Sequence, residues 1–124
     1  MRFQRGQAMV EFAGVSIIFF LLFFIILDGG RALYSWATVA EVAREGAHQA
    51  EMTETTDPQI RSAINAHAGL LGDLGSTATI TPSGSRTAMQ TVTITVTYQY
   101  RTVTPLLSSF GPINFTASTV VVVE

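Results

Sequence analysis

Residues 5–27 read RGQAMVEFAGVSIIFFLLFFIIL, an almost uninterrupted apolar run from which the organisation of the whole chain follows. Its residues 13–27 carry no charge, but that run is shorter than the roughly 20 apolar residues that a helix needs to cross a bilayer. Extending the run back to Gln7 supplies the missing length and places Glu11 inside it. The pattern therefore predicts a transmembrane helix over residues 7–28.

The remainder, residues 29–124, has an ordinary globular composition rich in Thr, Ala and Val, which predicts one small head domain. The net charge is −2, and the seven cationic residues are all scattered arginines, which argues against a nucleic-acid partner. The chain has no cysteine, which excludes disulfides, a thiolate nucleophile and a cysteine-ligated metal.

Charges that flank the apolar run predict its orientation. Arg2 and Arg5 precede it, whereas Asp28 and Arg31 roughly cancel after it. Positive flanks stay in the cytoplasm, so we expect a single-pass protein of the inner (cytoplasmic) membrane with a cytoplasmic N-terminus and an extracytoplasmic head.

A cleaved secretory signal is the alternative interpretation of the same segment. Gly30-Arg31-Ala32 offers a loose small-x-small cleavage site. The apolar core is long for a signal peptide, however, and Glu11 separates it from the basic residues, so the membrane span is favoured.

A helical period continues beyond the span. We expect one helix from about Gln7 to Glu51, about 70 Å long, with a possible bend at Gly29-Gly30. Its inner face is predicted to consist of residues that recur at steps of three and four, namely Leu33, Trp36, Ala40, Ala43, Ala47 and Ala50. The solvated side is predicted to hold Ser35, Thr38, Glu41, Arg44, Glu45, His48 and Glu51.

A second helix is predicted from Pro58 to Leu71, with Asp57 as its N-cap. Its expected inner face is Ile60, Ala63, Ile64, Ala68 and Leu71. Gly69 and Gly72 mark its end.

After Ser76 the period changes to two, which predicts strands at residues 77–81, 91–101 and 113–124. The inward residues of the middle strand are expected to be Val92, Ile94, Val96, Tyr98 and Tyr100, and those of the last strand Ile113, Phe115, Ala117, Thr119, Val121 and Val123. Residues 120–123 are apolar on both faces, so they are either covered on both sides or form an edge that seeks a partner. Helices followed by a small antiparallel sheet predict an α+β head whose Val/Ile/Tyr face is covered by the alanine-rich helix.

No set of residues predicts catalysis, a cofactor or a metal. His48 and His67 lie at no convincing metal-ligand spacing and are expected to be solvated surface residues. The apolar side chains of the last connection, Leu106, Leu107 and Phe110, are either an exposed contact patch or core plugs beneath a loop. We therefore expect no enzyme.

Glu11 is the unusual residue of the span. A carboxylate within an apolar segment costs about 2.5–3.5 kcal/mol at mid-membrane and is usually paired with a cation. A cut after Gly6 would give Gln7 a new α-ammonium group. That amine is separated from its own chain's Glu11 by a little over one turn, but the amine of a neighbouring, staggered chain could meet the carboxylate.

These residues resemble a known processing site. Gly6, four further residues, Glu11 and the aromatic Phe12 before an apolar helix look like the cleavage site of type IV pilin-like proteins. The segment GRALYSWATVAEVAREGAHQA at 30–50 resembles TadE-like pseudopilins of tight-adherence (Flp, type IVc) pilus systems, in which Gly-Arg-Ala-Leu and Ala-Arg-Glu-Gly-Ala recur. Major Flp pilins are little more than the helix and usually have Tyr where Phe12 stands. A head of this size is therefore typical of the minor, pseudopilin class.

The resemblance implies a pilin-like fold and a role in initiating or assembling a pilus. It implies that residues 1–6 are a cytoplasmic leader, removed between Gly6 and Gln7 by an aspartyl-type prepilin peptidase that can also methylate the new amine. Glu11 would neutralise the N-terminal ammonium of a neighbouring subunit. The implied partners are this peptidase, other pilins and pseudopilins, the inner-membrane assembly platform and the lipid bilayer. A membrane-anchored extracytoplasmic binding module without a filament role is the alternative.

Overall fold

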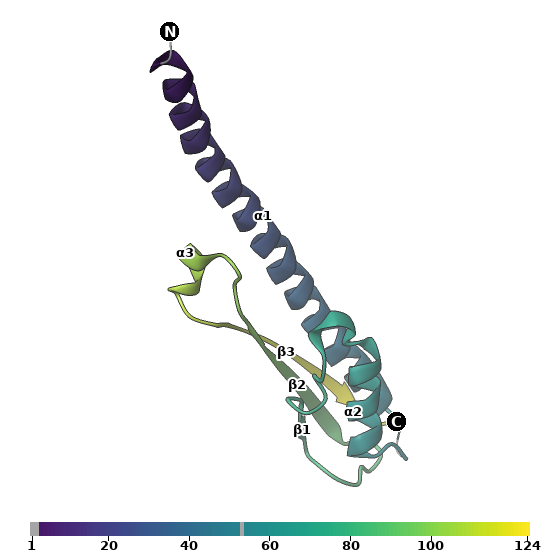
Figure 1. Ribbon diagram of the computed structural model, residues 1–124. Coiled ribbons are helices and arrows are strands. Elements are labelled where there is room, and N and C mark those ends of the chain that lie inside the picture. The colour runs from purple at the N-terminus through teal and green to yellow at the C-terminus, as the bar shows by residue number, and fades with distance from the viewer. Residues whose placement is uncertain (1–2, 53) are drawn as a thin grey trace.

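The computed structural model describes residues 3–52 and 54–124, with side chains described for 6–52, 54–105 and 107–124. Its architecture is α+β, as predicted: a long helix, a short helix and a three-stranded antiparallel sheet packed on the long helix (Figure 1). In chain order the elements are α1 (Phe3–Ala50), α2 (Asp57–His67), the 3-10 turn η1 (Gly69–Leu71), β1 (Thr79–Thr81), β2 (Thr91–Tyr100), α3 (Pro105–Ser108) and β3 (Ile113–Val122).

The helix α1 combines two predicted segments in one element of 48 residues, about 70 Å long. It continues through Gly29 and Gly30, and Figure 1 shows no break at its middle. A Cβ atom added at either glycine would meet nothing within 4 Å, so neither position is required for packing. The N-terminal half projects away from the head, and the C-terminal half lies across the sheet (Figure 1).

The sheet has the order β1-β2-β3 with antiparallel neighbours. The predicted alternation in β2 is confirmed: Val92, Ile94, Val96 and Tyr100 are buried and Tyr98 is half-buried. In β3 the same face is half-buried from Phe115 to Val121. Tyr98 pairs with Phe115 across the two strands.

β3 is an edge strand within the described chain, because β2 is its one neighbour in the sheet. The two outward valines near its end, Val120 and Val122, are 62 % and 50 % exposed. Residues 120–123 were expected to be either covered on both sides or part of an apolar edge. The structure shows the apolar edge.

The face of α1 that meets the sheet differs from the prediction at its N-terminal end. Ala43, Ala47 and Ala50 are buried, as expected, but Leu33 and Trp36 are 68 % and 58 % exposed. The buried stripe instead includes two residues assigned to the solvated side, Ser35 and Thr38, together with Val39 and Val42.

Ser35 shows why a polar residue is tolerated on the buried face. Its hydroxyl donates to the carbonyl of Arg31 one turn earlier, at 2.9 Å, so its polar group is satisfied by the helix itself. The predicted stripe followed apolar residues at steps of three and four, which included Leu33 and Trp36 at its N-terminal end. The sheet instead packs on smaller residues, which allow its backbone to come close.

Gly46 marks a close approach of α1 to the rest of the head. A Cβ atom built there would lie 2.9 Å from Cδ1 and Cγ1 of Ile64 on α2 and 3.3 Å from Cγ2 of Ile94 on β2. Both isoleucines are fully buried. The glycine therefore lets one helix contact α2 and the sheet at the same level.

The start of α2 differs by one residue from the prediction. The N-cap is Thr56, whose backbone N–H donates to Oε1 of Gln59 at 2.8 Å, and Asp57 is the first helical residue. The Asp57 carboxylate bonds elsewhere: it accepts from the N–H of Gly84 at 3.0 Å and pairs with the buried guanidinium of Arg86. The Asp57 carboxylate therefore binds Gly84 and Arg86, which are distant in the sequence, and does not cap the helix. The helix ends at His67 rather than at Leu71, and residues 69–71 form the separate turn η1. Of the expected inner face, Ile60, Ile64 and Ala68 are buried, whereas Ala63 and Leu71 are half-buried.

Candidate functional site

The N-terminal half of α1, residues 6–27, forms a stem that the head leaves uncovered. Every large apolar side chain from Met9 to Leu27 is exposed. The best window of 18 residues has a mean hydropathy of 2.7 and none of it is buried, so α1 is long and apolar enough to cross a membrane. Full burial of one such side chain stabilises by about 1.5–3 kcal/mol, so covering the stem is favoured by on the order of tens of kcal/mol. The stem therefore suggests a single membrane anchor.

The residues of the predicted processing site lie at the free end of this stem. Gly6, Gln7, Glu11 and Phe12 are all exposed, and the space around Gly6 is open. Gln7 and Glu11 are one helical turn apart, which places them on the same side of α1. Among the side chains that the structure describes, none forms a hydrogen bond or ion pair with Glu11.

A second constellation lies where the stem meets the head, and sequence reasoning missed it. Asp28 ends the apolar run, yet its side chain is buried, with a relative exposure of 3 %. Its Oδ2 accepts from the backbone N–H of Thr104 at 2.7 Å, and its two oxygens lie 3.0 and 3.1 Å from the N–H of Val103. We call Asp28 with Tyr100, Val103 and Thr104 the Asp28 clamp.

Tyr100 completes the clamp from the end of β2. Its hydroxyl donates to the main-chain carbonyl of Asp28 at 3.0 Å and lies 3.2 Å from Oδ1. Burial raises the pKa of Tyr100, and the negative charge of Asp28 adds to this effect. The clamp therefore favours the protonated, hydrogen-bond-donating form of the phenol.

Arg31 joins the clamp from the next turn of α1. Its Nη1 lies 3.3 Å from Oδ1 of Asp28, and its guanidinium sits 5.6 Å from the centre of the Tyr100 ring. In the sequence, the one sign of the clamp is Asp28 at the end of the apolar run, and this position alone indicates a charge that flanks a membrane span. The partners come from 72 to 76 residues further along the chain, so only the fold reveals them.

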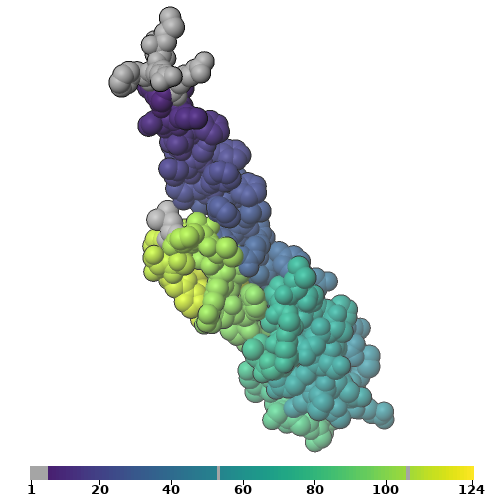
Figure 2. All heavy atoms as spheres, in the orientation of Figure 1, coloured from purple at the N-terminus to yellow at the C-terminus, as the bar shows by residue number. Residues whose placement is uncertain are grey.

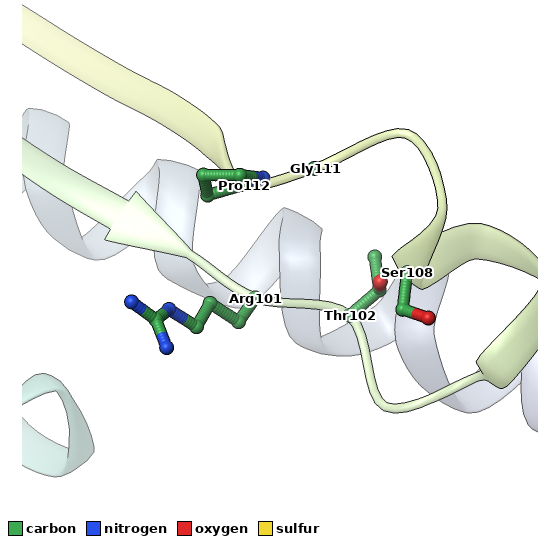
Figure 3. A pocket seen from close by; sticks show the side chains of 5 residues that line it. All are labelled: Arg101, Thr102, Ser108, Gly111 and Pro112. Atoms are coloured by element: carbon green, nitrogen blue, oxygen red, sulfur yellow. The ribbon is translucent and has the colours of Figure 1, made fainter.

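The clamp holds the connection between β2 and β3 against the stem. We call residues 102–112 of this connection the hairpin tip. At its neck a hollow of about 250 Å³ is lined by Arg101, Thr102, Ser108, Gly111 and Pro112. Figure 3 shows Thr102 and Ser108 close together on facing arms, whereas Arg101 points away from them. The hollow offers hydroxyl and backbone groups but no carboxylate or imidazole, so its lining does not form a general acid–base pair.

Both histidines lie on the surface, as predicted. His48 and His67 are exposed, and Nδ1 of His48 lies 3.0 Å from a carboxylate oxygen of Glu51. Among the described residues, no group of three or more His, Cys, Asp or Glu side chains could hold a metal ion. The alternatives for the last connection are resolved in part, because Phe110 is 85 % exposed whereas Leu107 is half-buried.

Comparison with known proteins gives one match. Residues 6–48 match the model of the family described as TadE-like protein. The match covers the stem, the Asp28 position and the helix face that packs on the sheet as far as His48. No curated protein and no solved structure matches the chain. The predicted resemblance to this family is thus confirmed over residues 6–48.

Proposed function

We propose, because this chain is a TadE-like protein over residues 6–48, that it is a non-enzymatic pseudopilin, or minor pilin, of a tight-adherence (Flp-type) type IV pilus. It takes part in initiating or assembling the filament. The observation that carries the proposal is the exposed stem: a continuous helix extends its apolar half beyond the core of the head and leaves every large apolar side chain from Met9 to Leu27 exposed. Such a surface is suited first to lipid and then to the stems of neighbouring subunits.

The exposed N-terminal end of the stem supports processing between Gly6 and Gln7. In this proposal residues 1–6 are a cytoplasmic leader, residues 7–28 span the inner membrane and residues 29–124 form the extracytoplasmic head. The Gly6–Gln7 bond lies inside α1, so the prepilin peptidase has to unwind the first turn before it cuts. Gly6 favours this step, because glycine destabilises a helix by about 1 kcal/mol relative to alanine.

Glu11 then serves assembly. Its carboxylate is exposed on the stem and would be buried without a cation once stems pack together. The α-ammonium group of Gln7 on a neighbouring, staggered subunit supplies that cation and fixes the register of the two helices. A buried pair of this kind contributes to specificity more than to stability. Phe12 belongs to the motif that the peptidase recognises.

The proposed partners follow from these two steps, leader cleavage and assembly. They are the prepilin peptidase, the other pilins and pseudopilins of the same system, the inner-membrane assembly platform and the bilayer itself. A membrane-anchored extracytoplasmic binding module would share the span and the head but would keep residues 1–6 and would not enter a filament.

Mass spectrometry of the mature N-terminus tests the proposal. The protein is purified from cells that contain the active peptidase, next to a Gly6→Leu variant. We expect the unaltered protein to begin at Gln7, with or without one methyl group, and the variant to keep residues 1–6. A chain that begins at Met1 in both cases would support the plain anchor, and one that begins at Leu33 would indicate a secreted domain. Either result would refute the pseudopilin assignment.

A further inference from the structure

The hairpin tip is an uncharged part of the head that exposes large apolar side chains. The sequence carries no charged residue from Thr102 to Val123. Within the tip, Val103 is 61 % exposed and Phe110 is 85 % exposed. Phe110 therefore gains nothing from the fold of the described chain, although its burial would stabilise by about 1.5–3 kcal/mol.

The tip lies beside the stem rather than beside the sheet. Thr104 and Pro105 form one side of an apolar groove of about 420 Å³, whose other side is formed by stem residues Ile17, Phe20, Leu21 and Phe24. Those residues precede Asp28 by four to eleven positions, or about 6–16 Å along the helix axis. Figure 2 shows the tip as a protrusion alongside the stem, with the rest of the head below it.

This placement puts the tip beside the part of the stem that is proposed to lie within the bilayer. The inference rests on the proposed span of residues 7–28. The hydrocarbon half-thickness is about 15 Å, so a tip that reaches 6–16 Å beyond Asp28 lies in the half of the bilayer that faces the head. We propose that the hairpin tip inserts into this half-bilayer next to the stem and forms a second, interfacial anchor.

The backbone of the tip is suited to a medium without water. The N–H groups of Leu107 and Ser108 both donate to the carbonyl of Thr104, and those of Phe110 and Gly111 donate to Leu107 and Ser108. Pro105 and Pro112 have no N–H to satisfy. The hydroxyl of Ser108 donates to the carbonyl of Pro105 at 2.7 Å. The Asp28 carboxylate accepts from the N–H groups of Val103 and Thr104, so most of the described backbone N–H donors of the tip are paired, which lipid favours. The hydroxyls of Thr102 and Thr104 are buried without a hydrogen-bond partner in the described structure.

The base of the tip carries the charges expected at a lipid headgroup. Arg101 is exposed directly before the tip, and Arg31 is exposed beside the clamp with its guanidinium against the Tyr100 ring. Arginines and tyrosines are typical of the zone between hydrocarbon and water, where they meet phosphates. The apolar tip, the arginines at its base and the head follow one another as expected across a lipid–water interface. This arrangement favours lipid, rather than a partner protein, as the medium that covers the tip.

Depth-dependent fluorescence quenching tests the proposal. A Trp36→Phe background, which alters one exposed side chain, receives a single tryptophan by Phe110→Trp, by Phe19→Trp in the stem or by Ser85→Trp in an exposed loop of the head. The whole chain is reconstituted into vesicles of phosphatidylethanolamine and phosphatidylglycerol with brominated acyl chains. We expect Phe110→Trp and Phe19→Trp to be quenched strongly and Ser85→Trp to be unaffected.

Adding Asp28→Ala to Phe110→Trp provides a second measurement. Loss of the clamp should release the tip from the stem and reduce its quenching, whereas the quenching of Phe19→Trp should not change. Strong quenching of Phe19→Trp with none for Phe110→Trp would overturn the inference and leave the span intact. Protection of Phe110→Trp from aqueous acrylamide without quenching by bromine would likewise overturn it, because protein and not lipid would then cover the tip. Absence of quenching for Phe19→Trp would reject the span itself.

Discussion

The Tyr100 hydroxyl donates a hydrogen bond to the backbone carbonyl of Asp28 across 72 residues of sequence, at 3.0 Å. This bond joins the last residue of β2 to the residue at which the stem ends. Together with the bonds from Val103 and Thr104, it fixes how the head is attached to the helix. Hydrogen bonds therefore hold the junction of stem and head in a defined geometry.

Asp28→Ala is expected to destabilise the head by about 1–3 kcal/mol, because it leaves the N–H groups of Val103 and Thr104 without their carboxylate acceptor, whereas the Tyr100 hydroxyl keeps the backbone carbonyl of residue 28. Denaturant unfolding in detergent, followed by circular dichroism, measures the change. Hydrogen exchange should also accelerate at the Val103 and Thr104 amides. Glu41→Ala, an exposed position on the same helix, is the matched control and should change little. Equal stability of the two variants would contradict the role of the clamp.

The phenol of Tyr100 should titrate above the ordinary pKa of tyrosine. Burial raises its pKa in the folded state, so the unfolded chain loses this proton first as the pH rises. The corresponding stability is complete below the ordinary tyrosine pKa of about 10 and is lost as the pH climbs from there towards the raised value. Near-ultraviolet absorbance titration of the folded protein measures this raised pKa, and Tyr100→Phe should remove the late phase. A late phase that persists in Tyr100→Phe would show that another tyrosine is responsible.

Gly46→Val and Gly30→Val form a matched pair on α1. Both introduce the same side chain into one helix, but the first meets Ile64 and Ile94 and the second meets open space. We expect Gly46→Val to lose about 1–3 kcal/mol of stability through overpacking, and Gly30→Val to remain within a few tenths of a kcal/mol of the parent. Comparable thermal unfolding of the two variants would exclude a packing role for Gly46.

Glu11→Ala is expected to leave membrane insertion intact and to abolish co-assembly into pili. Removal of the carboxylate makes insertion easier but leaves a neighbour's ammonium group without a partner. Val10→Ala, the preceding position on the stem, is the control and should still be incorporated. Membrane fractionation and immunoblots of sheared pili report the two properties. Normal incorporation of Glu11→Ala would disprove the pairing role.

Local sequence patterns determined the elements of this protein. The apolar run, the helical period after it and the alternation from Thr91 to Tyr100 depend on neighbours within a few residues, so the long helix, the sheet and the α+β class followed directly. The processing motif proposed for Gly6 to Phe12 is likewise a local pattern, because it consists of consecutive residues. The TadE-like match over residues 6–48 covers this local part of the chain.

Only the tertiary structure decided how polar and small residues were used. Asp28 reads as a flanking charge and Asp57 as a helix cap, but each binds donors brought from distant segments. Leu33 and Trp36 fit the apolar period of the helix and were predicted to face the core, yet both are exposed and Ser35 is buried. A side chain's partners depend on which surfaces meet in space. Hydrophobic period therefore predicted where α1 would form, but not which stripe of it would be buried.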